Sequence, residues 1–578
     1  YIHRWRLEPK EEERERYFSG ELVEPQKPIV FYVDSSFPDK WREVIKLGIE
    51  DWNTAFEAAG FKNAIQARDY PKDNPDFDPD DIRYSCVKYA TTTTANAMGP
   101  SFTDPRSGEI LTADVIWYHN IVSLLHNWRF CQTAATDSSV RKTVFDDETM
   151  CESMRYVISH EIGHTLGLMH NMGASYAFPV DSLRSATFTQ KYGTTPSIMD
   201  YARNNYIAQP GDLERGVKMT PPILGVYDIY AIAWGYHLIP GANSPAEEEA
   251  TLTRWIEEKA DDPMYEFGAQ QIMGTIDPTD QTEDLGNDHM RAGDYGISNL
   301  KIIMDNLEAW SGEQGKPYES LADVYDQLIK QYTRYIGHVM TYIGGVVYKD
   351  ARQGKENMSR TYLDKDTQKR AVAWLLHQAR TYNQWLTPSS LMLKFDRPLN
   401  SNDKLRRSIV ASLLNSSAFY RIEEGGLVDK QKNYTLEGYL DDVISGIFQL
   451  SYQGKALDSN EQELQSTALD ILIKYSGLST NSTKKTTEAD KSLADYASVT
   501  HLRDNLELPC NDETAFLRIN MGQQSISNTR IAPLTYAYLK KIESLYKQQR
   551  TQTNDKSTRD FYDYQLLQLK KLFESSTL

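Results

Sequence analysis

The alternation of apolar and polar positions predicts strands and a long helix in the first part of the chain. Pro28 to Val33 is a short apolar run rich in β-branched and aromatic residues, which is typical of a buried strand. From Asp39, apolar residues recur at helical spacing until Gly60, where a helix should end. Further strands are expected at 65–68, 82–89 and 113–118. This pattern predicts an α+β domain in which a helix lies across a sheet.

From about Glu247 the pattern changes to longer helical stretches rich in Leu, Gln, Lys and Tyr. We therefore expect a mostly α-helical region that covers one flank of the α+β domain, walls part of a cleft or holds a protein partner. Residues 476–490, rich in Ser, Thr, Asn and Lys, are expected to form an exposed connection. The helical stretches include 295–310, 321–342, 369–385, 402–420, 436–450, 461–475 and 534–547.

The eleven residues from His160 to His170 carry the clearest chemical signal, reading HEIGHTLGLMH. On a helix, His160 and His164 lie one turn apart on the same face, so both imidazoles can reach one metal ion. Gly167 can adopt a left-handed conformation that ends the helix and lets His170 approach from another direction. Three histidines with an open fourth position are the pattern of a catalytic zinc. The alternative is a buried helix whose histidines serve packing, but five fixed positions rarely coincide by chance.

This string resembles the signature of the metzincin zinc endopeptidases, HExxHxxGxxH followed by a turn that contains methionine. The resemblance implies a catalytic domain with a mixed, mostly parallel twisted sheet, an active-site helix and a Met-turn, followed here by the helical region. Ser197 to Tyr201, reading SIMDY, is the matching turn, so Met199 is expected to form the apolar floor under the metal ligands. Tyr201 matches a tyrosine that supports the oxyanion in some branches; packing in the cleft wall is its alternative role.

A narrower resemblance rests on Asn171 after the third histidine and on three further stretches, 4–9, 28–32 and 227–232. Together they are similar to the large zinc-dependent metzincins of Bacteroides-type, Gram-negative bacteria. The resemblance implies an exported protein of the periplasm, outer-membrane surface or surroundings, with a further domain upstream. We accordingly expect an extension over 1–27, a catalytic domain over 28–246 and the helical region over 247–578.

Composition narrows the range of functions. The 63 Lys and Arg against 81 Asp and Glu give a net charge of −18, which excludes a general nucleic-acid binder because phosphate neutralisation needs excess positive charge. No apolar run is long enough to predict a transmembrane helix. The four cysteines are too few for a disulfide scaffold, and whether Cys131 and Cys151 form a bridge or remain thiols is open.

Two other segments are candidate binding elements. The run Met98-Gly99-Pro100-Ser101 stands where the metzincin resemblance implies an antiparallel edge strand over the cleft, which would bind an extended peptide by strand addition; an ordinary loop at Gly99-Pro100 is the alternative. The acidic segment 73–81 offers oxygen ligands for calcium, but its spacing matches no EF-hand, so a solvated turn is the preferred interpretation.

The sequence thus predicts a zinc-dependent endopeptidase that hydrolyses protein or peptide substrates outside the cytoplasm. Zinc held by His160, His164 and His170 would lower the pKa of a bound water, and Glu161 would act as its general base. The alternative, from another functional class, is a surface binding or assembly protein with a latent or vestigial zinc site. Proteolysis that stops on zinc chelation would distinguish the two.

Overall fold

The computed structural model describes residues 2–271, 275–354, 356–478 and 524–574. Two units make up the chain. The first holds residues up to Gln270 together with 279–331, and the second holds 271–278 and the described residues from Tyr332 onward. The domain boundaries expected after residues 27 and 246 remain predictions.

Five strands form the sheet of the first unit, in the order β2-β1-β3-β7-β4. The strands β2 (Ile65–Asp69), β1 (Ile29–Val33), β3 (Ser85–Ala90) and β7 (Val115–Tyr118) are parallel, and β4 (Ala97–Met98) pairs antiparallel with β7 at the edge. A separate ladder joins β5 (Ser101–Thr103) to β6 (Ile110–Ala113). The predicted mixed, mostly parallel sheet of an α+β fold is therefore confirmed.

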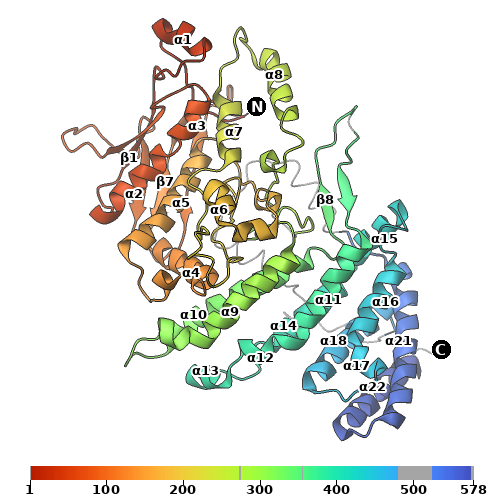
Figure 1. Ribbon diagram of the computed structural model, residues 1–578. Coiled ribbons are helices and arrows are strands. Elements are labelled where there is room, and N and C mark those ends of the chain that lie inside the picture. Colours follow the sequence, from red (N-terminus) through yellow and green to blue (C-terminus); the bar gives the residue numbers. More distant parts are fainter. Residues whose placement is uncertain (1, 272–274, 355, 479–523, 575–578) are drawn as a thin grey trace. The chain divides into compact units, whose positions relative to one another are not determined.

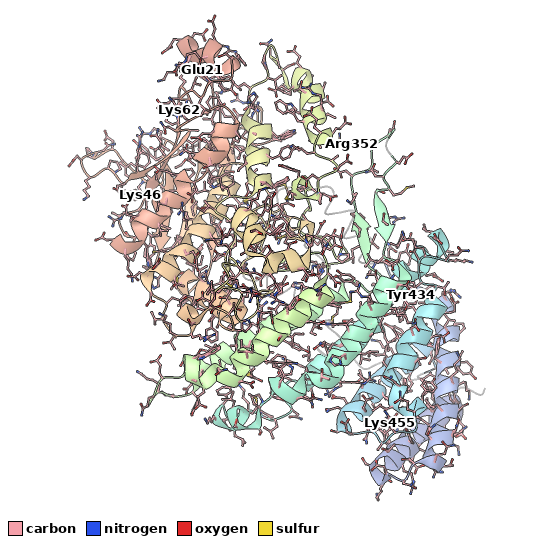
Figure 2. All side chains as sticks on the ribbon, in the orientation of Figure 1. Glu21, Lys46, Lys62, Arg352, Tyr434 and Lys455 are labelled. Carbon is pink, nitrogen blue, oxygen red and sulfur yellow. The ribbon has the colours of Figure 1, made fainter. Side chains whose placement is uncertain are left out.

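Helices α2 (Asp39–Glu50) and α5 (Asp147–Thr165) lie side by side in this unit (Figure 1). Their apolar faces share one core with the inward side chains of the sheet, because alternate strand positions such as Phe31, Val33, Val87 and Trp117 are fully buried. On the outer side of α2, Lys46, labelled in Figure 2, forms an ion pair with Asp69 at the end of β2 (2.9 Å). The core thus holds α5 against the sheet.

The single helix expected from Asp39 to Gly60 is in fact two helices, α2 and α3 (Asn53–Ala58). The break has local causes. Asp51 pairs with Arg155 of α5 (2.5 Å), and the indole N–H of Trp52 donates to the Ser159 carbonyl (2.9 Å). Asn53 then binds both backbone groups of Ile65 on β2. These tertiary contacts override the continuous helical pattern of the sequence.

The remaining elements of the first unit surround this core. Residues before Lys27 include α1 (Arg14–Phe18) and pack on the unit, with Tyr17 buried and Val23 bridged to Phe61. The other helices are α4 (Ile121–Thr133), α6 (Ala186–Tyr192), α7 (Val226–Tyr236), α8 (Pro245–Glu257) and α9 (His289–Ser311), and α10 (Glu319–Met340) begins in this unit.

The second unit is mostly helical, as expected. In it α18 (Ser459–Ser476) packs against α14 (Asp403–Leu413) and α21 (Asn528–Gln552), and α21 packs against α22 (Lys556–Glu574). It also holds a hairpin that the apolar pattern does not indicate, formed by β8 (Val346–Tyr348) and β9 (Arg360–Tyr362). The other helices are α11 (Lys365–Thr381), α12 (Asn383–Leu386), α13 (Ser389–Lys394), α15 (Ser416–Val428), α16 (Leu436–Ile447) and α17 (Gln449–Tyr452).

Two further expectations from the sequence concern the exposed connection and membrane-spanning helices. Most of the predicted exposed connection at 476–490 lies outside the described residues. Within the described part of the chain, none of the helices combines the length and apolar character needed to cross a bilayer.

The close contact of α2 and α5 gives a first prediction. A β-carbon at Gly48 would overlap Ile158 and lie 3.1 Å from the Ser159 hydroxyl. Overpacking typically costs about 1–3 kcal/mol, which exceeds the helix-propensity gain of up to about 1 kcal/mol, so Gly48→Ala should lower the free energy of unfolding. Chemical denaturation measures the change.

Gly235 in α7 is the matched control, because its β-carbon would meet its nearest atom at 3.8 Å. Gly235→Ala should be neutral or slightly stabilising. Equal stability of the two variants would contradict the tight packing of α2 on α5.

Candidate metal centre

The helix α5 ends where the motif requires the chain to turn. Gly167 has φ +94°. Its N–H donates to the His164 carbonyl (3.0 Å), and the N–H of Leu168 donates to the Gly163 carbonyl (3.1 Å). This pair of bonds is the Schellman arrangement that closes a helix with a left-handed residue. The expected turn at Gly167 is therefore present, and it brings His170 back toward the helix.

Two distant segments secure the end of this helix. The indole N–H of Trp5 donates to the Thr165 carbonyl (2.8 Å), and the hydroxyl of Tyr236 donates to the Leu166 carbonyl (2.9 Å). The last carbonyls of a helix lack partners inside it, so the two side chains satisfy these acceptors. Trp5 lies in one of the stretches that carry the narrower family resemblance.

The three histidines of the motif converge on one point. The Nε2 atom of His170 lies 3.3 Å from Nε2 of His160 and 3.1 Å from Nε2 of His164. Among the described residues, this trio is the one group of His, Cys, Asp or Glu side chains whose ligand atoms all lie within 4.8 Å of one another. The structure thus brings together the three residues that the spacing predicts.

Each imidazole is oriented through its other nitrogen. Nδ1 of His160 faces the Ile198 carbonyl (2.6 Å), Nδ1 of His164 faces the Leu168 carbonyl (3.0 Å), and Nδ1 of His170 faces Oε1 of Gln270 (2.9 Å). Carbonyl oxygens only accept hydrogen bonds, so each Nδ1 carries a proton, and in a neutral ring this leaves the lone pair on Nε2.

The electrostatics favour neutral rings. Burial lowers the pKa of His160 and of His170 well below the ordinary value of histidine, and the neighbouring imidazoles lower it further. A neutral imidazole is the form that binds a metal ion. Both rings are therefore held in the protonation state of a ligand.

The donor set fits zinc. Zn–N bonds of about 2.0–2.1 Å in a tetrahedral site imply ligand nitrogens about 3.3 Å apart, which matches the two observed separations. Three lone pairs directed at one point repel each other unless a cation lies between them. The residues present therefore fit a three-histidine zinc site with one position left for another ligand.

Met199 packs against the helix that carries His160 and His164. It is 1% exposed, and a β-carbon on Gly163, between His160 and His164, would overlap its sulfur. The Met199 carbonyl accepts a hydrogen bond from Asn171, the residue after the third histidine (3.0 Å). The methionine thus contacts α5 between two of the three histidines, and its role as the floor of the site remains a prediction.

A buried carboxylate holds the turn around Met199 in shape. Asp228 accepts hydrogen bonds from the Ser197 hydroxyl (2.6 Å) and from the N–H groups of Ile198 (2.9 Å) and Gly225 (2.6 Å). Burial raises the pKa of Asp228 to about 6, although the three donors oppose that rise. Because Ile198 also accepts the His160 bond, Asp228 acts on the metal centre through one intervening residue.

Of the two predicted catalytic residues, Glu161 is the chain neighbour of His160 and Tyr201 packs against two of the histidine rings. Glu161 follows His160 on α5 and is 6% exposed. The ring of Tyr201 is 4.6 Å from the His170 ring and 5.4 Å from the His160 ring, centroid to centroid. The guanidinium of Arg203, which forms a buried ion pair with Glu283 (3.0 Å), lies 4.6 Å from the Tyr201 centroid.

The four predicted substrate-binding residues fall in different settings. Met98 ends the edge strand β4, and a β-carbon on Gly99 would overlap the Glu161 carbonyl, so this part of the strand lies directly against α5. The Pro100 carbonyl accepts a hydrogen bond from the N–H of Asp114 (3.0 Å). Ser101 belongs instead to β5, where it pairs with Ala113.

Sequence reasoning misses two residues that orient the centre. Asp228 lies in a stretch of family resemblance that assigns it no role, and Gln270 falls in the region predicted to be helical. The position of neither residue follows from a sequence motif: Asp228 is one buried acid after the Met199 turn, and Gln270 lies one hundred positions after the histidine that it contacts.

The acidic segment 73–81 forms exposed turns in which Asp81 binds Arg83 and Asp80 binds Lys88.

Removing the Asp228 carboxylate should loosen the Met-turn. Asp228→Ala leaves three buried donors without their acceptor, and each such loss typically costs about 1–3 kcal/mol, so we expect a loss of roughly 3 kcal/mol or more in the free energy of unfolding. Asp228→Asn retains one carbonyl oxygen and should lose less. Denaturant titration measures the free energy of unfolding of both variants. An alanine variant as stable as the parent would contradict the role of Asp228 in holding the turn.

Comparison with known proteins agrees with this geometry. No curated protein and no solved structure matches the chain. A family model described as Met-zincin matches residues 142–455, which is more than half of the chain and includes the histidine trio and Met199. The chain therefore belongs to the Met-zincin family.

Proposed function

We propose that the protein is a zinc-dependent endopeptidase that hydrolyses peptide bonds of protein substrates. The observation that carries this proposal is the convergence of three imidazole nitrogens, one of them on the residue that precedes Glu161. Zinc held by His160, His164 and His170 would supply a Lewis acid that polarises the scissile carbonyl and makes water a better nucleophile near neutral pH. Membership of the Met-zincin family supports the same class of hydrolase.

Glu161 is the proposed general base. Its carboxylate takes a proton from the attacking water and later delivers that proton to the nitrogen of the leaving amine. Glu161 follows His160 on a helix held by the core, which fixes the backbone from which this carboxylate extends. Its low exposure excludes most bulk water, which favours proton transfer within the site.

Tyr201 is the proposed oxyanion donor. Its ring packs against the ring of His170, so the side chain lines the same site as the three histidines. A phenol donates a hydrogen bond to the oxygen of the attacked carbonyl as negative charge develops there. Arg203, which is paired with Glu283, packs against this ring and helps to hold it beside the histidines.

The strand β4 is the proposed platform for the substrate backbone. It is the edge of the sheet, and Gly99 allows it to lie against the Glu161 segment of α5. An extended peptide added to such an edge is held by main-chain hydrogen bonds with little dependence on its sequence. Met98 and Gly99 are the proposed contacts, whereas Ser101 is engaged in the β5–β6 ladder.

The proposed substrates are extracellular or envelope proteins of a Gram-negative bacterium. Support for this location comes from the sequence stretches that resemble the large Bacteroides-type metzincins. The second unit is a proposed site for a protein partner.

Glu161→Gln should retain zinc but lose at least about a hundredfold in turnover, because general base catalysis typically contributes that much or more. Metal analysis and digestion of casein measure the two properties. Glu148→Gln, an exposed change on the same helix, is the matched control and should keep both. If the turnover of Glu161→Gln stays within threefold of the parent, Glu161 is not the general base. If the parent protein binds casein but does not cleave it, the protein is better described as a binding protein.

Tyr201→Phe removes the hydroxyl and keeps the ring. We expect kcat to fall about a hundredfold with little change in KM, as is typical for loss of one oxyanion donor. Steady-state kinetics on a fluorogenic peptide separates the two constants. An unchanged kcat would assign Tyr201 to packing against the histidines.

A further inference from the structure

A short downstream segment runs along the chain immediately after the third histidine. The N–H of Met172 donates to the Gly268 carbonyl (2.7 Å), and Asn171 and Ala269 form an antiparallel bridge. The Asn171 side chain adds two more bonds: its amide nitrogen donates to the Glu266 carbonyl (3.1 Å), and its oxygen accepts from Gly268 (2.8 Å). Asn171 is fully buried, so all these bonds are shielded from water. We call residues 266–270 the strap.

Two glycines allow the strap to approach so closely. A β-carbon on Gly268 would lie 2.7 Å from the Gly173 Cα, and one on Gly173 would lie 3.1 Å from the Gly268 Cα. Such contacts with backbone atoms are closer than β-carbons normally make, so neither position accepts a side chain without displacement. The strap therefore has a defined register on the His170 segment, and this register places Gln270 opposite His170.

Gln270 differs from the outer partners of the other two histidines. Those partners are the backbone carbonyls of Ile198 and Leu168, which belong to the turns that flank the site. For His170, Nδ1 faces the side-chain oxygen of Gln270 instead, at 2.9 Å. Of the three bonds that orient the imidazoles, this one alone depends on a side chain and can be removed by substitution.

We infer that Gln270 is a positioning residue for the metal centre, holding His170 in the tautomer and direction required of the third ligand. The amide oxygen accepts a hydrogen bond from Nδ1–H, which keeps the proton on Nδ1 and leaves the lone pair of Nε2 directed at His160 and His164. The strap keeps that oxygen in place through Asn171. Zinc affinity thus depends on a segment one hundred residues beyond the motif.

This inference rests on the proposed zinc site but not on peptidase activity. If Gln270 positions His170, its loss weakens zinc binding even in a protein with no measurable proteolysis. A failed digestion assay would contradict the proposed function alone, whereas an unchanged zinc affinity in the variant would contradict the positioning role alone.

The test compares variants of the full chain that separate hydrogen bonding from packing. Gln270→Met keeps an unbranched side chain of similar size without the acceptor, Gln270→Ala removes both, and Gln270→Glu restores an acceptor oxygen. Competition with a chromophoric chelator measures the Kd for zinc. Loss of such a partner typically weakens binding about 10- to 100-fold, so we expect that range for Met and Ala and a value within threefold of the parent, or tighter, for Glu.

A second readout uses the Co²⁺-substituted protein. Its visible absorption reports ligand geometry, and we expect it to change in Gln270→Met and to be retained in Gln270→Glu. Gln190→Ala is the matched control, because the Gln190 side chain also makes a hydrogen bond, in its case by donating to the Gly216 carbonyl (2.9 Å), and contacts none of the three histidines through it. Zinc affinity of Gln270→Met and Gln270→Ala within threefold of the parent, or an equal loss in Gln190→Ala, would overturn the inference.

Discussion

Three imidazole nitrogens must point their lone pairs at one position, and the rest of the first unit is arranged around that requirement. Bringing these lone pairs together is unfavourable unless a cation lies between them. Each ring is therefore held by a hydrogen bond at its other nitrogen, Nδ1. The structure does this with one carbonyl oxygen for each Nδ1, supplied by the Met-turn, the turn after α5 and Gln270. Binding of zinc by this trio would therefore be coupled to the fold of these three segments.

The support for this arrangement is polar and buried, which makes it dependent on complete hydrogen bonding. Asp228 satisfies three donors of the Met-turn region, and Asn171 satisfies groups on the strap. Each of these residues would be costly in an apolar interior without its partners. Their hydrogen bonds oppose movement of the loops, and in this conformation Met199 contacts Gly163.

The sequence predicts best what is local. His160 and His164 share a helix face through their spacing, and the left-handed Gly167 follows from the need to turn the chain, so the trio can be assigned from the amino-acid sequence alone. Strands β1, β2, β3 and β7 of the sheet follow from short apolar runs, whereas the edge strand β4 is expected only from the family resemblance. Gln270 cannot be found in this way, because its contact with His170 depends on the register of a non-periodic segment.

Tertiary contacts also explain the expectations that fail in detail. The break between α2 and α3 arises from bonds that Trp52 and Asn53 make to other elements, which helical periodicity does not contain. The sequence groups Ser101 with Met98 as one edge strand, yet the two belong to different ladders. Neighbouring residues separated by Gly99-Pro100 can change partners without any change in apolar pattern.

The most direct test of the account is X-ray absorption at the zinc edge on the purified protein. We predict one zinc per chain with three imidazole nitrogens at about 2.0–2.1 Å and oxygen in the remaining position. Sulfur scattering at about 2.3 Å, or fewer than three imidazoles around the ion, would contradict it.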